Sequence, residues 1–369
     1  MANSTDLALH RQHAHRLKGQ RFLRNVAWKA AHPGGRTLLY GPAVFENPYQ
    51  TLIYSAFPAR VSVGTTGRAA TYRKARIAGA YHMHWDEFGL SAGADGRPAY
   101  CAGLDAFLEA GGRLFWTVHN ADPHDGLAAD KQALFHEGRR YLSERAAAIH
   151  VHSDVARDLI CARYNADPAR VHVIPHPSYL GWYGDVARDR LKDGPSRFLA
   201  FGAFRDNKGL DLILAGLRGV ATSVPLGDVH IAGRGASAAG EDPVPGRAVR
   251  VTDGFIPDAD LPGLFGAADF SIFGFSSILT SGSLMLALGF GAVPVAPDLP
   301  TLRDALPEAL HPLLYRPGDA EDLTRVLEQA SDMPATHHAH LRAAAFAHAE
   351  DLRPERVSKR LYEVFDQAW

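Results

Sequence analysis

The chain alternates short apolar runs with longer helical patterns along most of its length, and this alternation is its strongest constraint on fold. Apolar runs that favour buried strands lie at 37–40, 59–63, 80–84, 113–119, 148–152 and 171–175, and again at 197–201, 228–232, 249–251, 270–273 and 293–296. Helical patterns lie between most of them, for example at 104–110, 125–148, 153–164, 210–217 and 258–268. Such alternation predicts parallel sheets that are covered by helices on both faces.

The length of the chain predicts two such domains rather than one. A chain of 369 residues exceeds the size at which a single hydrophobic core usually stops growing. The loop at 181–195 is rich in glycine and charge and ends in Pro195. We therefore expect two doubly wound, Rossmann-like α/β domains, the first over 1–182 and the second over 197–350, joined by a linker over 183–196.

Charge and cysteine content exclude several classes of protein. A formal net charge of −1 argues against a dedicated nucleic-acid binder, which is normally basic. Cys101 and Cys161 are the only cysteines, too few for a disulfide framework or a cysteine metal site. The sequence has no signal-peptide pattern and no apolar run of the roughly 20 residues that a membrane span needs. These features predict a cytoplasmic protein.

The N-terminal segment departs from this neutral average. No acidic residue lies between Asp6 and Glu46, and aromatic and aliphatic residues are interleaved with bases. The bases are Arg11, Arg16, Lys18, Arg21, Arg24, Lys29 and Arg36. One interpretation is a basic face that meets anionic lipid at the inner face of the plasma membrane, or a lipid-linked substrate. The other is a solvated arm with ordinary helix charges.

A glycine turn with two cations follows the strand at 197–201. The stretch from Phe198 to Asp211 reads FLAFGAFRDNKGLD, which predicts a strand, a turn carrying Arg205 and Lys208, and the start of an amphipathic helix. Free N–H groups and the positive end of a helix dipole favour an anion at such a turn. Arg205 can grip a phosphate through two parallel hydrogen bonds, while Lys208 acts as a point charge. The turn therefore predicts a diphosphate site.

A second segment of the same domain supports that prediction. Small hydroxyl residues lead into the apolar helix that follows residue 279, so Thr280, Ser281, Gly282 and Ser283 would form its N-terminus. Such a terminus offers free N–H groups and hydroxyls to a phosphate, although Ser and Thr also cap helices without any ligand. Gly233 marks a further close approach of backbone. Neither a Walker-type GxxxxGK[ST] nor an early GxGxxG occurs, which disfavours ATPases and dinucleotide enzymes.

Histidines mark the strand ends of the first domain. His82 and His84 alternate on one strand and so point to the same face, with Asp86 just beyond them. Two such histidines suit a metal-dependent hydrolase, but that site needs further ligands after later strands. Packing at a strand end, with the histidines orienting a loop, is the alternative. Because ligands of doubly wound sheets bind beyond the strand ends, His84 is also a candidate contact to a substrate.

His119 ends the next predicted strand, ahead of a polar, proline-containing loop. Imidazole titrates near neutral pH, so His119 could hydrogen-bond a hydroxyl or remove a proton. Asp122 and Asp86 are alternative bases, Asp125 is expected to cap the following helix, and Asn120 is a candidate substrate contact. His176 lies between two prolines after the strand at 171–175. It could contact a ligand or belong to a rigid exit turn.

The order of these parts resembles the GT-B glycosyltransferases, and within them the large bacterial family-4 group. The matching segments are WTVHN, AAAIHVHSDVARDLI, VHVIPHP, FGAFRDNKGLDLIL, VHIAGRG and FSSILTSGSLMLALGFGAVPVAP, which together span roughly residues 80–300. The resemblance implies two domains that face a cleft, with a closing helix over 351–369 that returns to the N-terminal domain. It also implies metal-independent sugar transfer, with Arg205 and Lys208 holding the donor diphosphate and His119 facing the donor sugar.

One departure from the family pattern affects the donor site. Many family-4 enzymes carry two glutamates before and within a helix of that site, whereas here no acid lies between Asp269 and Asp298. The serine-rich version is similar to xanthan-type exopolysaccharide mannosyltransferases, which favours mannose from GDP-mannose over a UDP-sugar and is compatible with an inverting as well as a retaining course. No cofactor is expected beyond the nucleotide-sugar, and the acceptor would be a glycan or a polyprenyl-linked glycan.

Rival functions follow from the same features. A nucleotide-sugar epimerase of the same architecture would need no acceptor. A catalytically silent relative, consistent with the missing glutamates, would bind nucleotide or glycan without turnover. A metal hydrolase built on His82 and His84 would need a bound metal.

Overall fold

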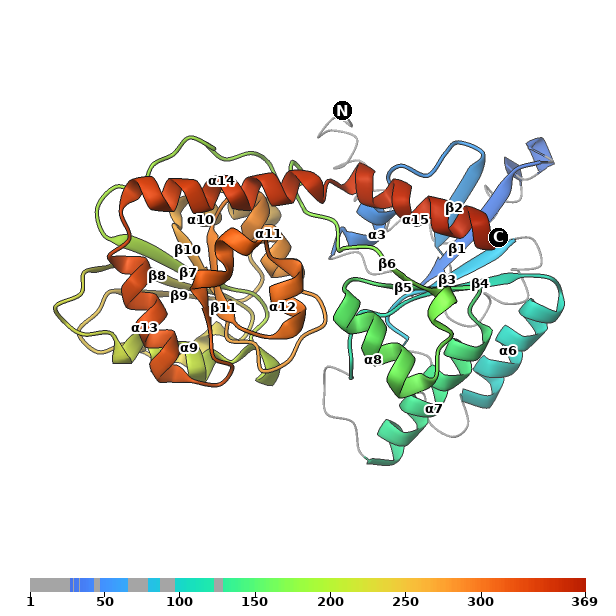
Figure 1. Ribbon diagram of the computed structural model, residues 1–369, viewed down its shortest axis with the longest axis horizontal. Helices are drawn as coiled ribbons and strands as arrows, with labels where there is room; N and C mark the ends of the chain where they lie inside the picture. The colour runs from blue at the N-terminus through green and yellow to red at the C-terminus, as the bar shows by residue number, and fades with distance from the viewer. Residues whose placement is uncertain are drawn as a thin grey trace. The chain divides into compact units, whose positions relative to one another are not determined.

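The computed structural model describes residues 27–28, 30–32, 34–42, 47–65, 79–86, 97–122 and 129–369. The chain divides into two compact units (Figure 1). The first comprises Met1–Pro177 together with Pro354–Trp369, and the second comprises Ser178–Arg353. The division thus falls a few residues before the linker that we expected over 183–196, and the last helix of the chain belongs to the first unit.

The first unit is built on a six-stranded parallel sheet. Its strands are β1 (Arg36–Gly41), β2 (Val61–Thr65), β3 (Ala80–Met83), β4 (Arg113–Thr117), β5 (Ala148–Val151) and β6 (Val171–Val173). They lie in the order β2-β1-β3-β4-β5-β6, and each adjacent pair is parallel. The central strands β3 and β5 are buried along their whole length, because helices cover both faces.

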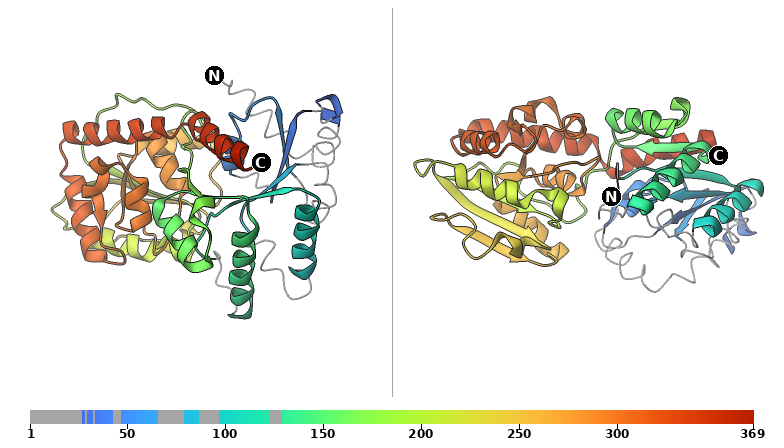
Figure 2. Two further views of the ribbon diagram at one scale, coloured as in Figure 1. Left: turned by 45° about the vertical axis from the view of Figure 1, so that its right-hand side comes forward. Right: turned by 90° about the horizontal axis from the view of Figure 1, so that it is seen from below.

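Helices lie on both sides of this sheet. They are α3 (Tyr49–Ile53), α6 (Arg97–Glu109), α7 (Ala129–Arg145), α8 (Asp154–Tyr164) and α15 (Pro354–Ala368), with a 3₁₀ turn η1 (Pro168–Arg170). Figure 1 and the left view of Figure 2 show α6 and α7 on one face and α15 on the other. Phe365 of α15 is fully buried and stacks on Phe115 of β4 at 3.9 Å, so the end of the chain completes this core.

The second unit holds another six-stranded parallel sheet. Its strands are β7 (Ser196–Phe201), β8 (Leu226–Gly233), β9 (Val249–Asp253), β10 (Phe270–Ile272), β11 (Val293–Pro297) and β12 (Leu314–Tyr315). Their order is β12-β11-β10-β7-β8-β9. Strands β7, β8 and β9 therefore follow one another toward one edge of the sheet, and β10, β11 and β12 follow one another toward the other edge.

The helices of the second unit also form two layers. They are α9 (Leu210–Gly219), α10 (Leu261–Ala267), α11 (Gly282–Phe290), α12 (Pro300–Ala305), α13 (Ala320–Ser331) and α14 (Ala335–Asp351), with the 3₁₀ turns η2 (Asp206–Lys208), η3 (Ala236–Ala239), η4 (Asp258–Asp260) and η5 (Glu308–Leu313). Helices α9 and α13 pack together below the sheet in Figure 1, and α10, α11 and α14 lie above it.

The predicted strands all occur, with shifted ends. The runs at 80–84, 113–119, 148–152 and 171–175 are each longer than the strand that forms, because the last one or two residues leave the ladder to make strand-end loops. The pattern missed β12, which has only two residues. It also placed the start of α6 too late, at 104 instead of Arg97.

Candidate functional site

The second sheet reverses its strand order between β7 and β10. In open α/β sheets, ligands bind outside the carboxyl ends of the strands at such a switch point. The loop after β7 carries Arg205 and Lys208, and the loop after β10 leads to α11. The two predicted phosphate-binding segments therefore flank one switch point within one unit.

Arg205 and Lys208 are two cations without a carboxylate partner in the part of the chain that the structure describes. Arg205 is exposed and precedes η2, and Lys208 ends it. The Lys208 ammonium lies 4.5 Å from the centre of the Phe275 ring. Burial, and then the charge of Arg205, lower the pKa of Lys208 to about 8. An anion bound between the two cations would offset both effects.

Glycines bring the backbone of these loops together. Gly209, at φ +61°, faces Gly274 so closely that a Cβ would collide with the Gly274 carbonyl oxygen. Gly233, a predicted contact and the last residue of β8, meets the Gly202 carbonyl oxygen in the same way. Only glycine fits at these two positions, so the backbones of neighbouring loops pack directly against each other at this end of the sheet.

The start of α11 is capped as expected for a helix beginning. The Ser281 hydroxyl accepts a hydrogen bond from Leu284 N at 3.2 Å and lies 3.0 Å from the Ser283 hydroxyl. Ser281 is almost fully buried, whereas Thr280, Gly282 and Ser283 are partly exposed. Ser281 thus caps the helix, and a phosphate role for Thr280, Gly282 and Ser283 stays a prediction.

In the first unit, six buried histidines gather near the carboxyl ends of β3 to β6. They are His82, His84, His119, His150, His152 and His176. Burial is the largest cause that lowers the pKa of every one of them, and the pKa of His150 and of His176 falls to about 4. The cluster is therefore uncharged at neutral pH.

His119 is buried with the rest of this cluster. Its Nε2 is 3.1 Å from His84 Nδ1, and its ring stacks on Trp85 at 4.2 Å. Trp85 adopts φ +40°, a conformation that costs a bulky residue on the order of 1–3 kcal/mol. His119 Nδ1 makes no hydrogen bond within the described residues. This nitrogen is free to meet a ligand.

Asp86 is placed as a structural ion pair. Both of its oxygens accept from the Arg139 guanidinium, at 2.7 and 3.1 Å, and both side chains are fully buried. Arg139 also donates to the carbonyls of Asn120 and Ala121, each at 2.8 Å. Asp86 thereby ties the end of β3 to the loop after β4. This geometry argues against its predicted role as a base.

The other predicted residues of this unit have distinct settings. Asp122 is half-exposed and pairs with Arg163 at 2.9 Å. Asn120 is partly buried, and its carbonyl is held by Arg139. His176 is buried and its Nδ1 lies 2.7 Å from the Pro177 carbonyl, which favours the rigid-turn interpretation. Asp125 lies outside the described residues.

The metal hypothesis for His82 and His84 finds no support in their contacts. Both ring nitrogens of His82 are engaged, by Tyr54 at 2.6 Å and Thr117 at 2.7 Å. His84 is engaged likewise, by Tyr54 and His119. No group of three or more potential ligands that could hold a metal ion occurs among the described residues.

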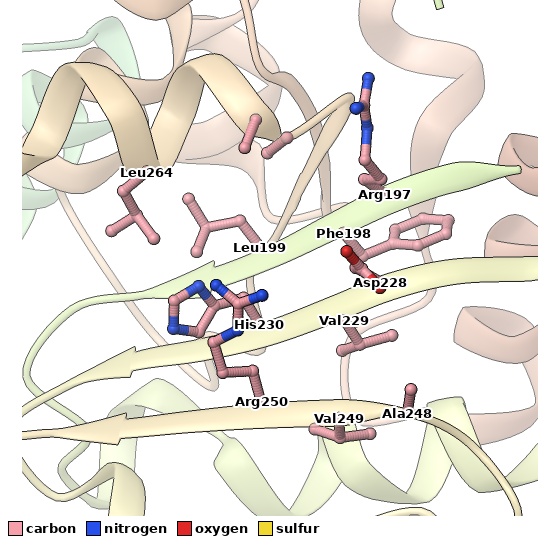
Figure 3. A pocket seen from close by; sticks show the side chains of 12 residues that line it. Arg197, Phe198, Leu199, Asp228, Val229, His230, Ala248, Val249, Arg250 and Leu264 are labelled. Atoms are coloured by element: carbon pink, nitrogen blue, oxygen red, sulfur yellow. The ribbon is translucent and has the colours of Figure 1, made fainter. Parts of the chain in front are cut away.

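A hollow of about 280 Å³ lies elsewhere on the second sheet. Figure 3 shows side chains of β7, β8 and β9 around it, with Leu264 of α10 above. Its β7 residues, Arg197 to Leu199, are the second to fourth of the six residues of that strand. The loop with Arg205 and Lys208 follows the carboxyl end of β7, and neither residue lines the hollow.

Most of the basic N-terminal segment lies outside the described residues. Its last member, Arg36, is described and forms an ion pair with Asp366 of α15, while its guanidinium lies 5.1 Å from the Trp369 ring centre. Arg36 therefore belongs to the packing of α15 rather than to a free basic face. Within the described ranges, no helix combines the length and apolarity needed to cross a membrane.

Comparison with known proteins supports the architecture. A family model described as Glycosyltransferase Family 4 matches residues 58–177. The structure of HepE from Anabaena, in complex with UDP and glucose, is similar with a TM-score of 0.68 at 13% identity, covering 90% of this chain and 100% of that one. The chain has the GT-B fold.

Other GT-B structures match to the same extent. Sucrose-phosphate synthase from Thermosynechococcus elongatus is 14% identical with a TM-score of 0.67, over 90% of this chain and 98% of that one. A glycosyltransferase from Rickettsia africae is 10% identical with a TM-score of 0.68, over the same shares. A search of curated proteins gives no match.

Several residues that contact the predicted site residues of the first unit were missed in the sequence analysis. His150 and His152 repeat the His-x-His pattern of His82 and His84 at the end of the next strand but one, and that repetition was the available signal. Arg139 and Tyr54 carry no such signal. Each comes from a helix or its end and meets its partner only in the folded chain.

Proposed function

We propose that the protein is a glycosyltransferase that moves a hexose from a nucleotide-diphosphate sugar to a glycan or polyprenyl-linked glycan acceptor. The family-4 match of residues 58–177 and the GT-B fold support the class of enzyme. The observation that carries the proposal is a pair of cations, Arg205 and Lys208, at the switch point of the second sheet, with no carboxylate partner among the described residues.

The chemistry follows from charge and hydrogen bonding. As the bond between the sugar and the diphosphate breaks, negative charge grows on the departing phosphate. Arg205 and Lys208 would stabilise it without a metal, assisted by N–H groups of the glycine loops and of the start of α11. The acceptor hydroxyl forms the new bond to the sugar and loses its proton. His119, which is uncharged and whose Nδ1 makes no hydrogen bond within the described residues, is the candidate to accept a substrate hydroxyl hydrogen.

Two nucleotide-sugars are candidates for the donor, GDP-mannose and a UDP-sugar. The serine-rich segment before α11 supports GDP-mannose, because of its resemblance to xanthan-type mannosyltransferases. HepE, with the same fold, was solved with UDP-glucose. We favour mannose as the sugar, with a UDP-sugar as the alternative donor, and we place the enzyme in the cytoplasm or at the inner face of the membrane.

The first experiment is thermal unfolding of the purified protein with GDP, UDP, ADP and their sugar conjugates. A ligand that binds only the folded state raises its apparent stability, so a selective rise with one nucleotide identifies the donor class. Lys208→Ala and Arg205→Ala should each weaken that binding by about 1.5–3 kcal/mol, the range for a charged hydrogen bond. Arg325→Ala, at an exposed ion pair with Asp322, is the matched control and should bind normally. Unchanged affinity in both loop variants would refute the diphosphate site.

Turnover distinguishes the rival functions. His119→Ala should keep nucleotide affinity and lose roughly 10²- to 10⁴-fold in transfer rate, the contribution of a positioned acid–base group. A nucleotide-sugar epimerase would convert its substrate without any acceptor. A silent relative would bind nucleotide and transfer nothing to any acceptor tested.

A further inference from the structure

A continuous row of hydrogen bonds crosses the first sheet and ends at His119. It runs through the Ile174 carbonyl, His150, Thr117, His82, Tyr54, His84 and His119. We call it the histidine row. All its members belong to the first unit. From its geometry we infer that the histidine row fixes His119 as the Nε2–H tautomer, so that a bare Nδ1 lone pair faces the ligand.

The direction of the row is set at its Ile174 end. The Ile174 carbonyl can only accept, so His150 Nε2, at 2.8 Å, must carry the hydrogen. A neutral imidazole has one N–H, so His150 Nδ1 is an acceptor. Thr117 Oγ1, at 3.0 Å, then donates its single hydrogen to that nitrogen. The Thr117 oxygen must in turn accept from His82 Nε2, at 2.7 Å.

The remaining hydrogen bonds, from His82 to His119, have their donors and acceptors fixed in the same way. His82 Nδ1 is left as an acceptor, so the Tyr54 hydroxyl donates to it at 2.6 Å. Tyr54 has then used its hydrogen and accepts from His84 Nε2 at 2.7 Å. His84 Nδ1 becomes an acceptor and receives Nε2–H of His119 at 3.1 Å. One proton remains on His119, and its Nδ1 has none.

This direction of the row depends on neutral histidines and a protonated tyrosine. Burial lowers the pKa of His82, His84, His119 and His150. Burial also raises the pKa of Tyr54 well above its ordinary value. At neutral pH every member is therefore in the state that the direction of the row assumes.

The consequence is a specificity for hydrogen donors. A bare Nδ1 accepts a hydroxyl hydrogen from a sugar and repels a substrate atom that can only accept. This part of the inference rests on the proposed transferase function. Thr117, His82, Tyr54 and His84 are accordingly positioning residues, which act on a substrate only through His119.

The test is ¹⁵N NMR of the full chain with labelled histidine, since protonated and bare ring nitrogens differ widely in shift. We expect a single Nε2–H tautomer for His119 near pH 7.5. Thr117→Val is close in shape and removes the hydroxyl. His82 can then move its proton to Nδ1, the row can reverse through Tyr54, and His119 should lose its single tautomer. Tyr54→Phe should have the same effect and covers the case in which Thr117→Val fails to fold.

Tyr49→Phe is the matched control. The Tyr49 hydroxyl meets His152 Nε2 at 3.3 Å, outside the row, and its ring lies 4.9 Å from His119, so the control tests for mere disturbance of packing. It should leave the tautomer unchanged. A wild-type His119 with Nδ1–H, or an unchanged tautomer in both row variants, would overturn the inference.

Turnover separates this inference from the proposed function. The NMR signature needs no substrate, so it can hold in a protein that transfers no sugar. If transfer is found, Thr117→Val should reduce its rate by roughly tenfold or more, within the contribution of a positioned acid–base group, with little change in nucleotide affinity. Intact transfer in a variant whose His119 tautomer has changed would show that the row does not serve the reaction.

Discussion

At the scale of single residues, Lys208 is the most informative cation of the proposed donor site. Its pKa lies at about 8 because burial and Arg205 both disfavour the ammonium. Binding of a diphosphate requires that charge, so affinity should fall as the pH rises above 8, by up to about tenfold per unit. Calorimetric titration with the donor between pH 7 and 9 measures this dependence.

Lys208→Arg supplies the control for that titration. A guanidinium stays charged across this range, so the variant should lose most of the pH dependence while still binding. An affinity of wild-type protein that stays level up to pH 9 would mean that Lys208 does not contact the phosphates.

Asp86 tests whether a predicted base is instead a structural group. Asp86→Asn leaves the Arg139 charge buried without its partner, which should cost about 3–5 kcal/mol of folding free energy. The matched control is Asp105→Asn, at the partly exposed pair with Arg145, which should cost about 1 kcal/mol or less. Denaturant unfolding measures both. A stable Asp86→Asn protein with greatly reduced turnover would restore the role of Asp86 as a base.

The residues of the two sites differed in how far sequence could identify them. Arg205 and Lys208 could be proposed from sequence because a glycine turn after a strand carries both cations within four positions of one loop. The Asp86–Arg139 pair was not, since the two lie 53 positions apart and meet only through β3 and α7. The direction of the histidine row was also beyond sequence, because it depends on Tyr54 and on the Ile174 carbonyl.

At the scale of elements, the loops after β7 and β10 depend on their glycines. Gly209→Ala would add strain at φ +61° and a collision with the Gly274 carbonyl oxygen. We expect a loss of at least about 2 kcal/mol in stability together with weaker nucleotide binding. Gly318 has a similar φ of +75° with open space around it. Gly318→Ala should therefore cost only about 1–2 kcal/mol, the left-handed strain alone, and bind normally.

Comparison of these two variants isolates the collision from the strain. Denaturant unfolding gives the free energies, and nucleotide titration gives the affinities. Equal effects of the two substitutions on both quantities would show that close backbone approach at Gly209 is not what shapes the loop.

Elements were easier to predict than their ends. Apolar runs locate strands because the core buries them on both faces. The apolar run does not show where the strand ends, because its last residues can lie in the loop that follows. His84 and His119 continue the apolar runs of β3 and β4 yet lie beyond the last residues of these strands. The backbone N–H of His84 still donates a hydrogen bond to the Gly41 carbonyl at 2.8 Å. Strand β12 was missed since two residues make no pattern.

At the scale of the whole molecule, the chain concentrates buried histidines in its first unit, and this predicts acid sensitivity there. In the unfolded chain these histidines gain protons near pH 6.5, whereas burial lowers the pKa of each in the folded unit, to about 4 for His150 and His176. The unfolded state therefore binds more protons below pH 6.5. Stability is complete above that pH and is lost as the pH falls, by about 1.4 kcal/mol per unit for each such histidine.

Tryptophan fluorescence can follow the first unit alone. Of the five tryptophans, only Trp182 lies in the second unit, so a Trp182→Phe background reports on the first. Denaturant unfolding of that protein should lose several kcal/mol between pH 7 and 5. Adding His176→Gln should reduce the dependence of the unfolding free energy on pH by the contribution of one histidine, about 1.4 kcal/mol per pH unit. Substitution of the exposed His337 should leave it unchanged. A first unit that is equally stable at pH 7 and pH 5 would contradict the neutral cluster, and with it the premise on which the direction of the histidine row depends.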